Sequence, residues 1–199
     1  GLEDGPKPFF NNVIISGNIS TLGGGIYTED NGSIFNKVVI ANNAAGGSHG
    51  YYYGSAMYCD GVYSHILKNV TITNNYVTSE GNGVALALDS FEGASILITN
   101  SIIWNEGISE IYFEEEEEES FIDVIHSDIQ YGWEGDGNIN LDPLFSNPEN
   151  GDYTLQENSP CIDAGTAYFE YEGEIIVNIP ESDYTGSAPD MGAYEFEGS

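Results

Sequence analysis

The chain has 199 residues, of which 40% are hydrophobic and 13% aromatic, enough apolar material to bury one core. Its 33 Asp and Glu residues stand against three lysines and no arginine, which gives a formal net charge of -30 at pH 7. Nucleic acids and anionic lipids bind proteins through Lys and Arg, so the composition excludes both as partners. Direct membrane insertion is excluded as well, because no stretch reaches the roughly 18–20 apolar residues that a spanning helix needs.

Short apolar segments recur along the first part of the chain and share one isoleucine position. That position is occupied by Ile15, Ile40, Ile72, Ile103 and Ile129. The spacing between these isoleucines is too uneven for ankyrin or leucine-rich repeats, but it suits a coil whose loops vary in length.

Two further series of strand-like runs accompany the isoleucines. One contains Gly25-Ile-Tyr-Thr, Ala56-Met-Tyr-Cys, Gly83-Val-Ala-Leu and Glu110-Ile-Tyr-Phe, in which Ile26, Met57, Val84 and Ile111 correspond. The other contains Ser33-Ile-Phe, His65-Ile-Leu, Ser95-Ile-Leu-Ile and Phe121-Ile-Asp-Val. Such short β-branched runs between Gly, Asn, Asp and Ser clusters indicate strands. We therefore predict an all-β fold, a right-handed parallel β-helix (a solenoid) with about three strands per rung and an interior of Ile, Val, Leu and Met.

Asparagines are enriched where the predicted strands meet turns. They form two series, Asn12, Asn36, Asn69 and Asn100, and Asn18, Asn43, Asn75 and Asn105. Stacked Asn amides can hydrogen-bond to one another along a solenoid, and Asn tolerates the left-handed backbone of tight turns. We expect ladders of this kind here.

The repeat stops after Gly132, and the motifs Asp142-Pro-Leu-Phe, Ser159-Pro-Cys-Ile-Asp-Ala-Gly and Asp190-Met-Gly-Ala-Tyr-Glu-Phe follow. This tail resembles the segment that follows right-handed β-helices in secreted bacterial proteins often described as choice-of-anchor Q domain proteins. The earlier segments Asn69-Val-Thr-Ile-Thr-Asn-Asn and Gly23-Gly-Gly-Ile-Tyr resemble the pectate-lyase-like β-helix superfamily.

The resemblance implies a fold and a secretion route but no activity. It divides the chain into β-helix rungs over residues 1–132 and a non-repetitive cap over residues 133–199, packed on the end or side of the solenoid as one continuous unit. It also implies a secreted or cell-surface bacterial protein, of which this chain is one part, with anchoring or sorting segments normally following residue 199.

Carboxylates recur in the turn after the second strand of each rung and could lie near one another. Ca²⁺ takes oxygen ligands of this kind, which makes Asp30, Asp60, Asp89 and Glu114 a candidate calcium column. A second oxygen cluster contains Asp136 and Asp142 but lacks the full EF-hand pattern. The alternative is that these residues occupy ordinary polar turns, and the Glu114 to Glu119 run is expected to be a solvated loop.

Two other kinds of site deserve consideration on the same strands. Asp60 and Asp89 are candidates for the paired carboxylates of a glycosidase. Tyr27, Tyr58 and Tyr112 are expected to point outward in one column, interrupted by Ala85, and are candidates for stacking on sugar rings. Stacking of Tyr on Tyr along the sheet is the alternative.

The histidines and cysteines give no site. His49, His65 and His126 occupy unrelated positions of the rung and share no metal-binding spacing. Cys59 and Cys161 are far apart in sequence, and we expect two free, buried thiols.

These features favour a non-catalytic extracellular structural or adhesive module that could bind glycan or cations weakly. Its partners would be a polysaccharide or another surface protein. The alternatives are a glycan-binding module and a polysaccharide-active enzyme. Among enzymes a glycosidase acting on a neutral glycan is favoured over a lyase, because the chain has no arginine and its only basic pair that could meet is Lys37 and Lys68.

Overall fold

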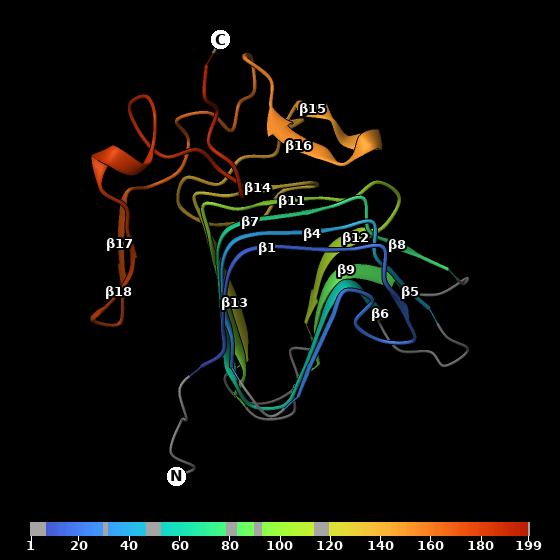
Figure 1. Ribbon diagram of the computed structural model, residues 1–199. Helices are drawn as coiled ribbons and strands as arrows, with labels where there is room; N and C mark the ends of the chain where they lie inside the picture. Colours follow the sequence, from blue (N-terminus) through green and yellow to red (C-terminus); the bar gives the residue numbers. More distant parts are fainter. Residues whose placement is uncertain are drawn as a thin grey trace.

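The computed structural model describes residues 7–29, 32–46, 53–78, 83–89, 93–113 and 120–198. Its parallel strands stack as a β-solenoid of about 3 turns, which Figure 1 shows along the stack. The predicted all-β solenoid, a parallel β-helix, is confirmed.

Three parallel sheets form the walls of the solenoid. The first consists of β1 (Phe9–Ser16), β4 (Ile34–Ala41), β7 (Ser64–Thr73), β10 (Ser95–Thr99), β13 (Phe121–Ile125), β11 (Ile102–Trp104) and β14 (Asp128–Ile129). The second is the small sheet of β2 (Ile19–Ser20), β5 (Ala44–Ala45) and β8 (Tyr76–Val77). The third consists of β3 (Ile26–Glu29), β6 (Tyr53–Asp60), β9 (Gly83–Asp89) and β12 (Ser109–Phe113).

Each rung turns a corner within the first sheet at one residue with left-handed backbone. The residues at this corner are Asn12, Lys37, Asn69, Asn100 and His126, with φ between 45° and 55°. Asn adopts this conformation more readily than most residues, which accounts for three of the five positions. Two of the predicted strand series, the isoleucine runs and the runs that begin near Ser33 and His65, are therefore the two arms of one bent strand in β4 and β7.

The strand register confirms the isoleucine column. Ile15 pairs with Ile40, and the column continues through Ile72 and Ile103 to Ile129. All lie on the inner face, where a change of one residue in register would turn the side chain outward.

The predicted alignment of the second series is wrong at one rung. Met57 pairs with Leu86, whereas Val84 pairs with Gly54, because the register shifts between Gly54 and Met57. Two residues of β6, Ser55 and Ala56, stand opposite one residue of β9, which is the geometry of a β-bulge. A bulge cannot be recognised in an ungapped comparison of the repeats.

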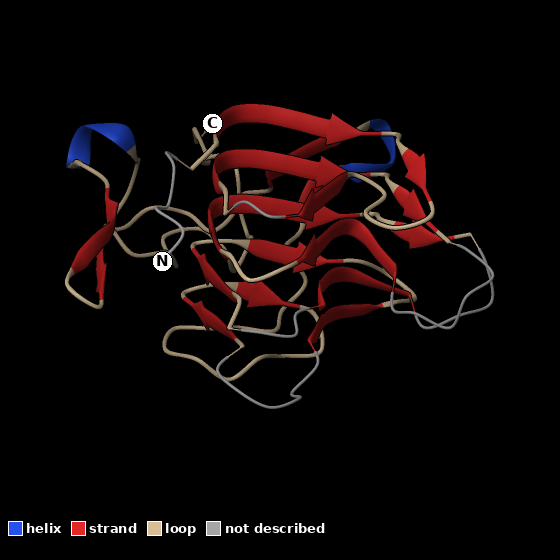
Figure 2. Ribbon diagram, turned by 90° about the horizontal axis from the view of Figure 1, so that it is seen from below, coloured by secondary structure: helices blue, strands red, loops and turns tan. Residues whose placement is uncertain are grey.

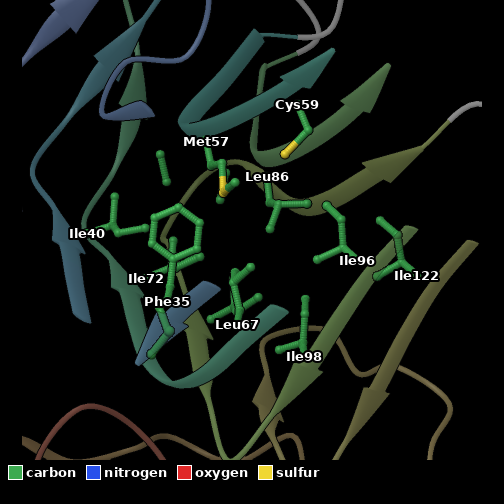
Figure 3. Close-up of a cluster of buried hydrophobic side chains, with 14 of the residues drawn as sticks. Phe35, Ile40, Met57, Cys59, Leu67, Ile72, Leu86, Ile96, Ile98 and Ile122 are labelled. Atoms are coloured by element: carbon green, nitrogen blue, oxygen red, sulfur yellow. The ribbon is translucent and has the colours of Figure 1, made fainter. Parts of the chain in front are cut away.

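The core runs through the middle of the solenoid. Figure 3 shows side chains from facing walls that point toward one another, among them Phe35, Ile40, Met57, Leu86 and Ile96. All five are buried to 1% exposure or less. Burying side chains of this size contributes about 1.5–3 kcal/mol each, so the burial of this core is the main source of the stability of the fold.

The segment after residue 132 first closes one end of the solenoid. The amide of Ile129 donates to the carbonyl of Ile139 at 3.1 Å, and Ile139 donates to Ser127 at 2.9 Å. The side-chain oxygen of Asn138 accepts from the amide of Ser127 at 3.0 Å. These bonds pair the edge that β14 would otherwise leave open.

The rest of this segment covers two outer faces of the solenoid (Figure 1), and one of its strand pairs stands to the side of the stack in Figure 2. It contains the antiparallel pairs β15 (Phe145–Asn147) with β16 (Asp152–Leu155) and β17 (Tyr168–Tyr171) with β18 (Glu174–Asn178), and the short helices η1 (Pro148–Asn150) and η2 (Glu181–Asp183). Tyr153 and Met191 pack against Val39 and Ile102 on one face. Ile176 and Val177 of β18 pack on Leu97 of β10, on the adjacent face.

Candidate functional site

A ladder of buried asparagines runs along the solenoid where the chain passes from the first sheet to the small second sheet. The side-chain oxygen of each of the last three members accepts from the amide nitrogen of the asparagine in the preceding rung: Asn18 to Asn43 at 3.0 Å, Asn43 to Asn75 at 3.1 Å, and Asn75 to Asn105 at 3.1 Å. Asn43, Asn75 and Asn105 are fully or nearly fully buried. The predicted Asn18 to Asn105 ladder is therefore confirmed, and its amides serve rung stacking.

Glu110 ends this ladder in place of a further asparagine. Its carboxyl oxygens accept from the backbone amide of Asn105 at 2.6 Å and from the Asn105 side-chain nitrogen at 2.7 Å. Glu110 is only 4% exposed, and burial raises the pKa of its carboxyl to about 8 against the effect of these two hydrogen bonds. Sequence reasoning missed this role, although a single Glu at the start of an apolar strand, five residues after a ladder asparagine, was a usable signal.

The predicted acidic column exists in part on the β3–β6–β9 wall. Glu29 pairs in register with Asp60, and Asp60 with Asp89. Adjacent parallel strands lie about 4.8 Å apart, so the carboxylates project from neighbouring rungs on the same face.

Tyrosines of the neighbouring column donate hydrogen bonds to these carboxylates. The Tyr27 hydroxyl donates to Asp60 at 3.1 Å and lies 3.3 Å from Glu29, while the Tyr58 hydroxyl donates to Asp89. Burial, followed by the hydrogen bond to Asp60, raises the pKa of Tyr27 to about 12, and burial with the Asp89 bond raises the pKa of Tyr58 further. These tyrosines therefore stay protonated as donors across the physiological range.

The tyrosine column is stacked as the alternative explanation expected. The rings of Tyr27 and Tyr58 are 5.8 Å apart and nearly parallel, at 7°. Ala87 stands in register between Tyr58 and Tyr112, not Ala85 as predicted, because of the same bulge. Tyr27 is 46% exposed but Tyr58 only 4%, so little of the Tyr58 ring faces solvent. A glycan contact by Tyr27, Tyr58 and Tyr112 stays a prediction.

The candidate calcium ligands are only partly placed. Asp30 and Glu114 lie outside the described residues, as do His49 and the predicted Glu114 to Glu119 loop. Asp136 and Asp142 are exposed, and Asp142 accepts from the amide of Leu144 at 2.9 Å. Within the part of the chain that is described, no three His, Cys, Asp or Glu side chains are grouped so as to hold a metal ion. Calcium binding stays a prediction.

The lysines line cavities between the solenoid and the segment that covers it. Lys37 and Lys68 line a cavity of about 300 Å³ at the left-handed corner, and Lys37 also lines one of about 690 Å³ beside Tyr194 and Glu195. Lys7 lines a third cavity, of about 760 Å³.

The smallest of these cavities, which we call the corner groove, is rich in amides. Its walls are formed by Asn11, Asn12, Asn36, Lys37, Lys68, Asn69, Val177, Asn178, Ile179, Pro180 and Asp183. Lys68 donates to the carbonyl of Ile176 at 2.9 Å, and burial lowers the pKa of its ammonium. Lys37 stands in register between Asn12 and Asn69, so the two lysines that the sequence paired do line one groove.

The remaining histidine and cysteine predictions concern buried groups. Cys59 and Cys161 are free and buried, as expected, and burial raises the pKa of both thiols. Cys161 donates to the buried carboxylate of Asp128 at 3.2 Å. His65 is 2% exposed, its Nδ1 accepts from the amide of Ser33 at 3.1 Å, and burial together with Lys7 lowers its pKa to about 4.

Comparisons with known proteins add no further assignment. A scan against protein-family models finds no match, and searches of curated proteins and of solved structures find none either. Among the described residues no helix is long and apolar enough to span a membrane. The fold and the geometry above define the class to which the chain belongs, that of parallel β-solenoids.

Proposed function

We propose that this chain is a non-catalytic structural module, a stiff β-helix that acts as a spacer or adhesive element on the surface of a bacterial cell. The observation that carries the proposal is that its repeated polar side chains bond to the next rung. Asp60 and Asp89 are each held by a tyrosine, and the buried asparagines are held by one another. Contacts of this kind stabilise the stack, and they account for these carboxylates and amides without an acid and base pair.

The resemblance in the sequence supports the setting of this proposal. The rung motifs are similar to those of the pectate-lyase-like superfamily, and the tail is similar to the choice-of-anchor Q segment, both typical of secreted proteins. A net charge of -30 is compatible with an extracellular medium whose ions screen the repulsion between carboxylates.

Catalysis by the acidic column is tested with a double variant, Asp60→Asn with Asp89→Asn. The protein is incubated with a panel of neutral and acidic polysaccharides, and new reducing ends and unsaturated products are measured. We expect no product from either protein. A matched control is Glu157→Gln, which changes one exposed carboxylate elsewhere. Product release that the double variant loses and the control keeps would contradict the proposal.

A second candidate function is glycan binding without catalysis, favoured by the corner groove. Asn amides both donate to and accept from sugar hydroxyls, and Lys37 adds a point charge. Lys37 also holds a left-handed backbone with φ of 53°, where its column neighbours Asn12 and Asn69 are asparagines. A residue that is less suited to its backbone than its neighbours points to a role outside the fold.

The variant Lys37→Asn tests this candidate, because Asn suits the left-handed position and removes only the charge and the long side chain. We expect binding to an immobilised polysaccharide to fall at least tenfold, while the melting temperature stays equal or rises slightly. Lys7→Asn is the control, since Lys7 lines a different cavity. Equal binding by both variants would remove the groove from consideration.

A further inference from the structure

The corner that turns each rung within the first sheet also holds part of the covering segment. At Asn100 the side-chain nitrogen donates to the carbonyl of Thr166, and the side-chain oxygen accepts from the amide of Thr166, both at 2.8 Å. An antiparallel strand offers its partner the same pair of groups, the N–H and the C=O of one residue. Asn100, which is fully buried, therefore binds a neighbouring stretch of backbone as a strand would.

The contact at Asn100 requires a very close approach of the bound backbone. A Cβ atom on Gly165 would lie 3.0 Å from the side-chain oxygen of Asn100 and 2.8 Å from the carbonyl of Pro189. A residue with a side chain would therefore have to displace its neighbours, whereas glycine fits. The backbone that this corner asparagine binds is a glycine followed by a threonine.

Asn69 occupies the same corner one rung earlier. The flanking residues pair in register, Lys68 with Thr99 and Thr71 with Ile102, and the backbone of both corner asparagines is left-handed, with φ of 53° at Asn69 and 48° at Asn100. Asn69 is only 3% exposed, yet its side chain makes no hydrogen bond to any of the described residues.

The side chain of Asn69 lines the corner groove, which has a volume of about 300 Å³. Buried amides are nearly always hydrogen-bonded, because leaving one unpaired costs about 1–3 kcal/mol. The amide of Asn69 is therefore placed to bind a group that enters the groove.

The opposite wall of the corner groove is formed by the covering segment and is largely apolar. Val177, Ile179 and Pro180 lie there, and Lys68 fixes this wall by donating to the carbonyl of Ile176 at 2.9 Å. A sugar ring presents hydroxyls on several sides, whereas an extended peptide presents backbone groups on its edges and side chains above and below. An amide beside an apolar wall suits the peptide better.

We propose that the corner groove binds an extended polypeptide segment of another protein, in which Asn69 bonds to the N–H and C=O of one residue as Asn100 bonds to Thr166. As at Gly165, the residue before the bound one is glycine. The inference rests on the proposed adhesive role, for which it names the class of partner, and it assigns the groove to a peptide in place of a glycan. Capture of an extended peptide through its backbone is a common mode of recognition between proteins.

Nuclear magnetic resonance titration of the full chain tests the proposal. The probe is the acetylated and amidated pentapeptide Ala-Gly-Thr-Ala-Tyr, which has the sequence of residues 164–168. We expect saturable binding with a dissociation constant below about 1 mM, and a shift of the side-chain NH₂ signal of Asn69. The same peptide with a methyl group on the threonine amide cannot donate to Asn69 and should bind about tenfold more weakly or worse.

Two matched variants locate the contact in the protein. Asn69→Gly removes the amide and keeps a residue that adopts the left-handed backbone without strain, so the dissociation constant should rise about tenfold or more. Asn74→Gly makes the same change at another left-handed position, with φ of 55°, whose side chain donates to the carbonyl of Pro148 at 3.4 Å. Asn74 does not line the groove, so this variant should bind as the wild type does.

Several results would overturn the inference. They are the absence of saturable peptide binding, equal binding of the methylated peptide, and peptide binding that Asn69→Gly leaves unchanged. Saturable binding of a neutral oligosaccharide in a titration where the peptide does not bind would give the groove to a glycan instead. None of these results bears on the non-catalytic role, which product release lost in the variant with Asp60→Asn and Asp89→Asn would contradict whatever the peptide does.

Discussion

At the corner of each rung, the left-handed backbone restricts which residue types are accommodated. The left-handed corner selects Asn at Asn12, Asn69 and Asn100, and the sequence pattern indicated this preference. Asn36, which the pattern placed in the same series, lies one residue earlier and donates to the Asn11 side chain at 2.7 Å. The error arises because Lys37 holds the corner in that rung, and lysine gives no signal for a left-handed backbone.

Glu110 makes the free energy of unfolding depend on pH. Its pKa is raised from 4.5 to about 8 in the folded chain, so the folded state holds a proton that the unfolded state loses between these values. The stability contributed by this proton is complete below about pH 4.5 and is lost as pH rises through about 8.

The variant Glu110→Gln cannot ionise and should not show this loss. Between pH 5 and pH 9, urea unfolding should show that the wild type loses on the order of 2 kcal/mol of unfolding free energy relative to Glu110→Gln. The full pKa shift, at about 1.4 kcal/mol per pKa unit, would give a larger loss. Glu157→Gln, at an exposed position, should follow the wild type. Identical pH dependence of wild type and Glu110→Gln would show that the buried carboxyl is ionised throughout.

At the level of strands, the isoleucine column could be predicted because every rung must place an apolar residue at the same inward position. The alignment of Val84 could not be predicted, because β6 has two residues, Ser55 and Ala56, opposite one residue of β9. The extra residue leaves the hydrophobic pattern of the strand unchanged. The register of Asp60 with Asp89 was within reach of the sequence. The bonds of Asp60 to Tyr27 and of Asp89 to Tyr58 were not, because each joins side chains of neighbouring rungs that lie two register positions apart.

The covering segment shows a second limit of prediction from sequence. Its motifs indicated a cap on the end or side of the solenoid, but its docking depends on single contacts across distant parts of the chain. Asn100 donates to the Thr166 carbonyl and accepts from the Thr166 amide, both at 2.8 Å, and Gly192 donates to the Asn100 carbonyl. The same residue that turns the corner of a rung therefore also binds the segment on the outside.

For the whole molecule, one mechanism accounts for most of the polar repeats. Apolar columns fill the interior, asparagines and two tyrosine–carboxylate pairs join neighbouring rungs, and Glu110 ends the asparagine ladder within its own rung. In a solenoid each rung contacts only its neighbours, so these contacts determine whether the stack holds together. The proposed role as a stiff module depends on that cohesion.

The most direct test of this account is chemical unfolding of Asn75→Ala beside Asn36→Ala. Asn75 makes buried bonds to Asn43, Asn105 and Ile40, and its loss leaves several buried groups without partners. We expect it to lower the free energy of unfolding by about 3–5 kcal/mol. Asn36, whose bond to Asn11 is exposed, should cost less than about 1 kcal/mol. Similar small losses in both variants would contradict the claim that the buried amide ladder holds the rungs together.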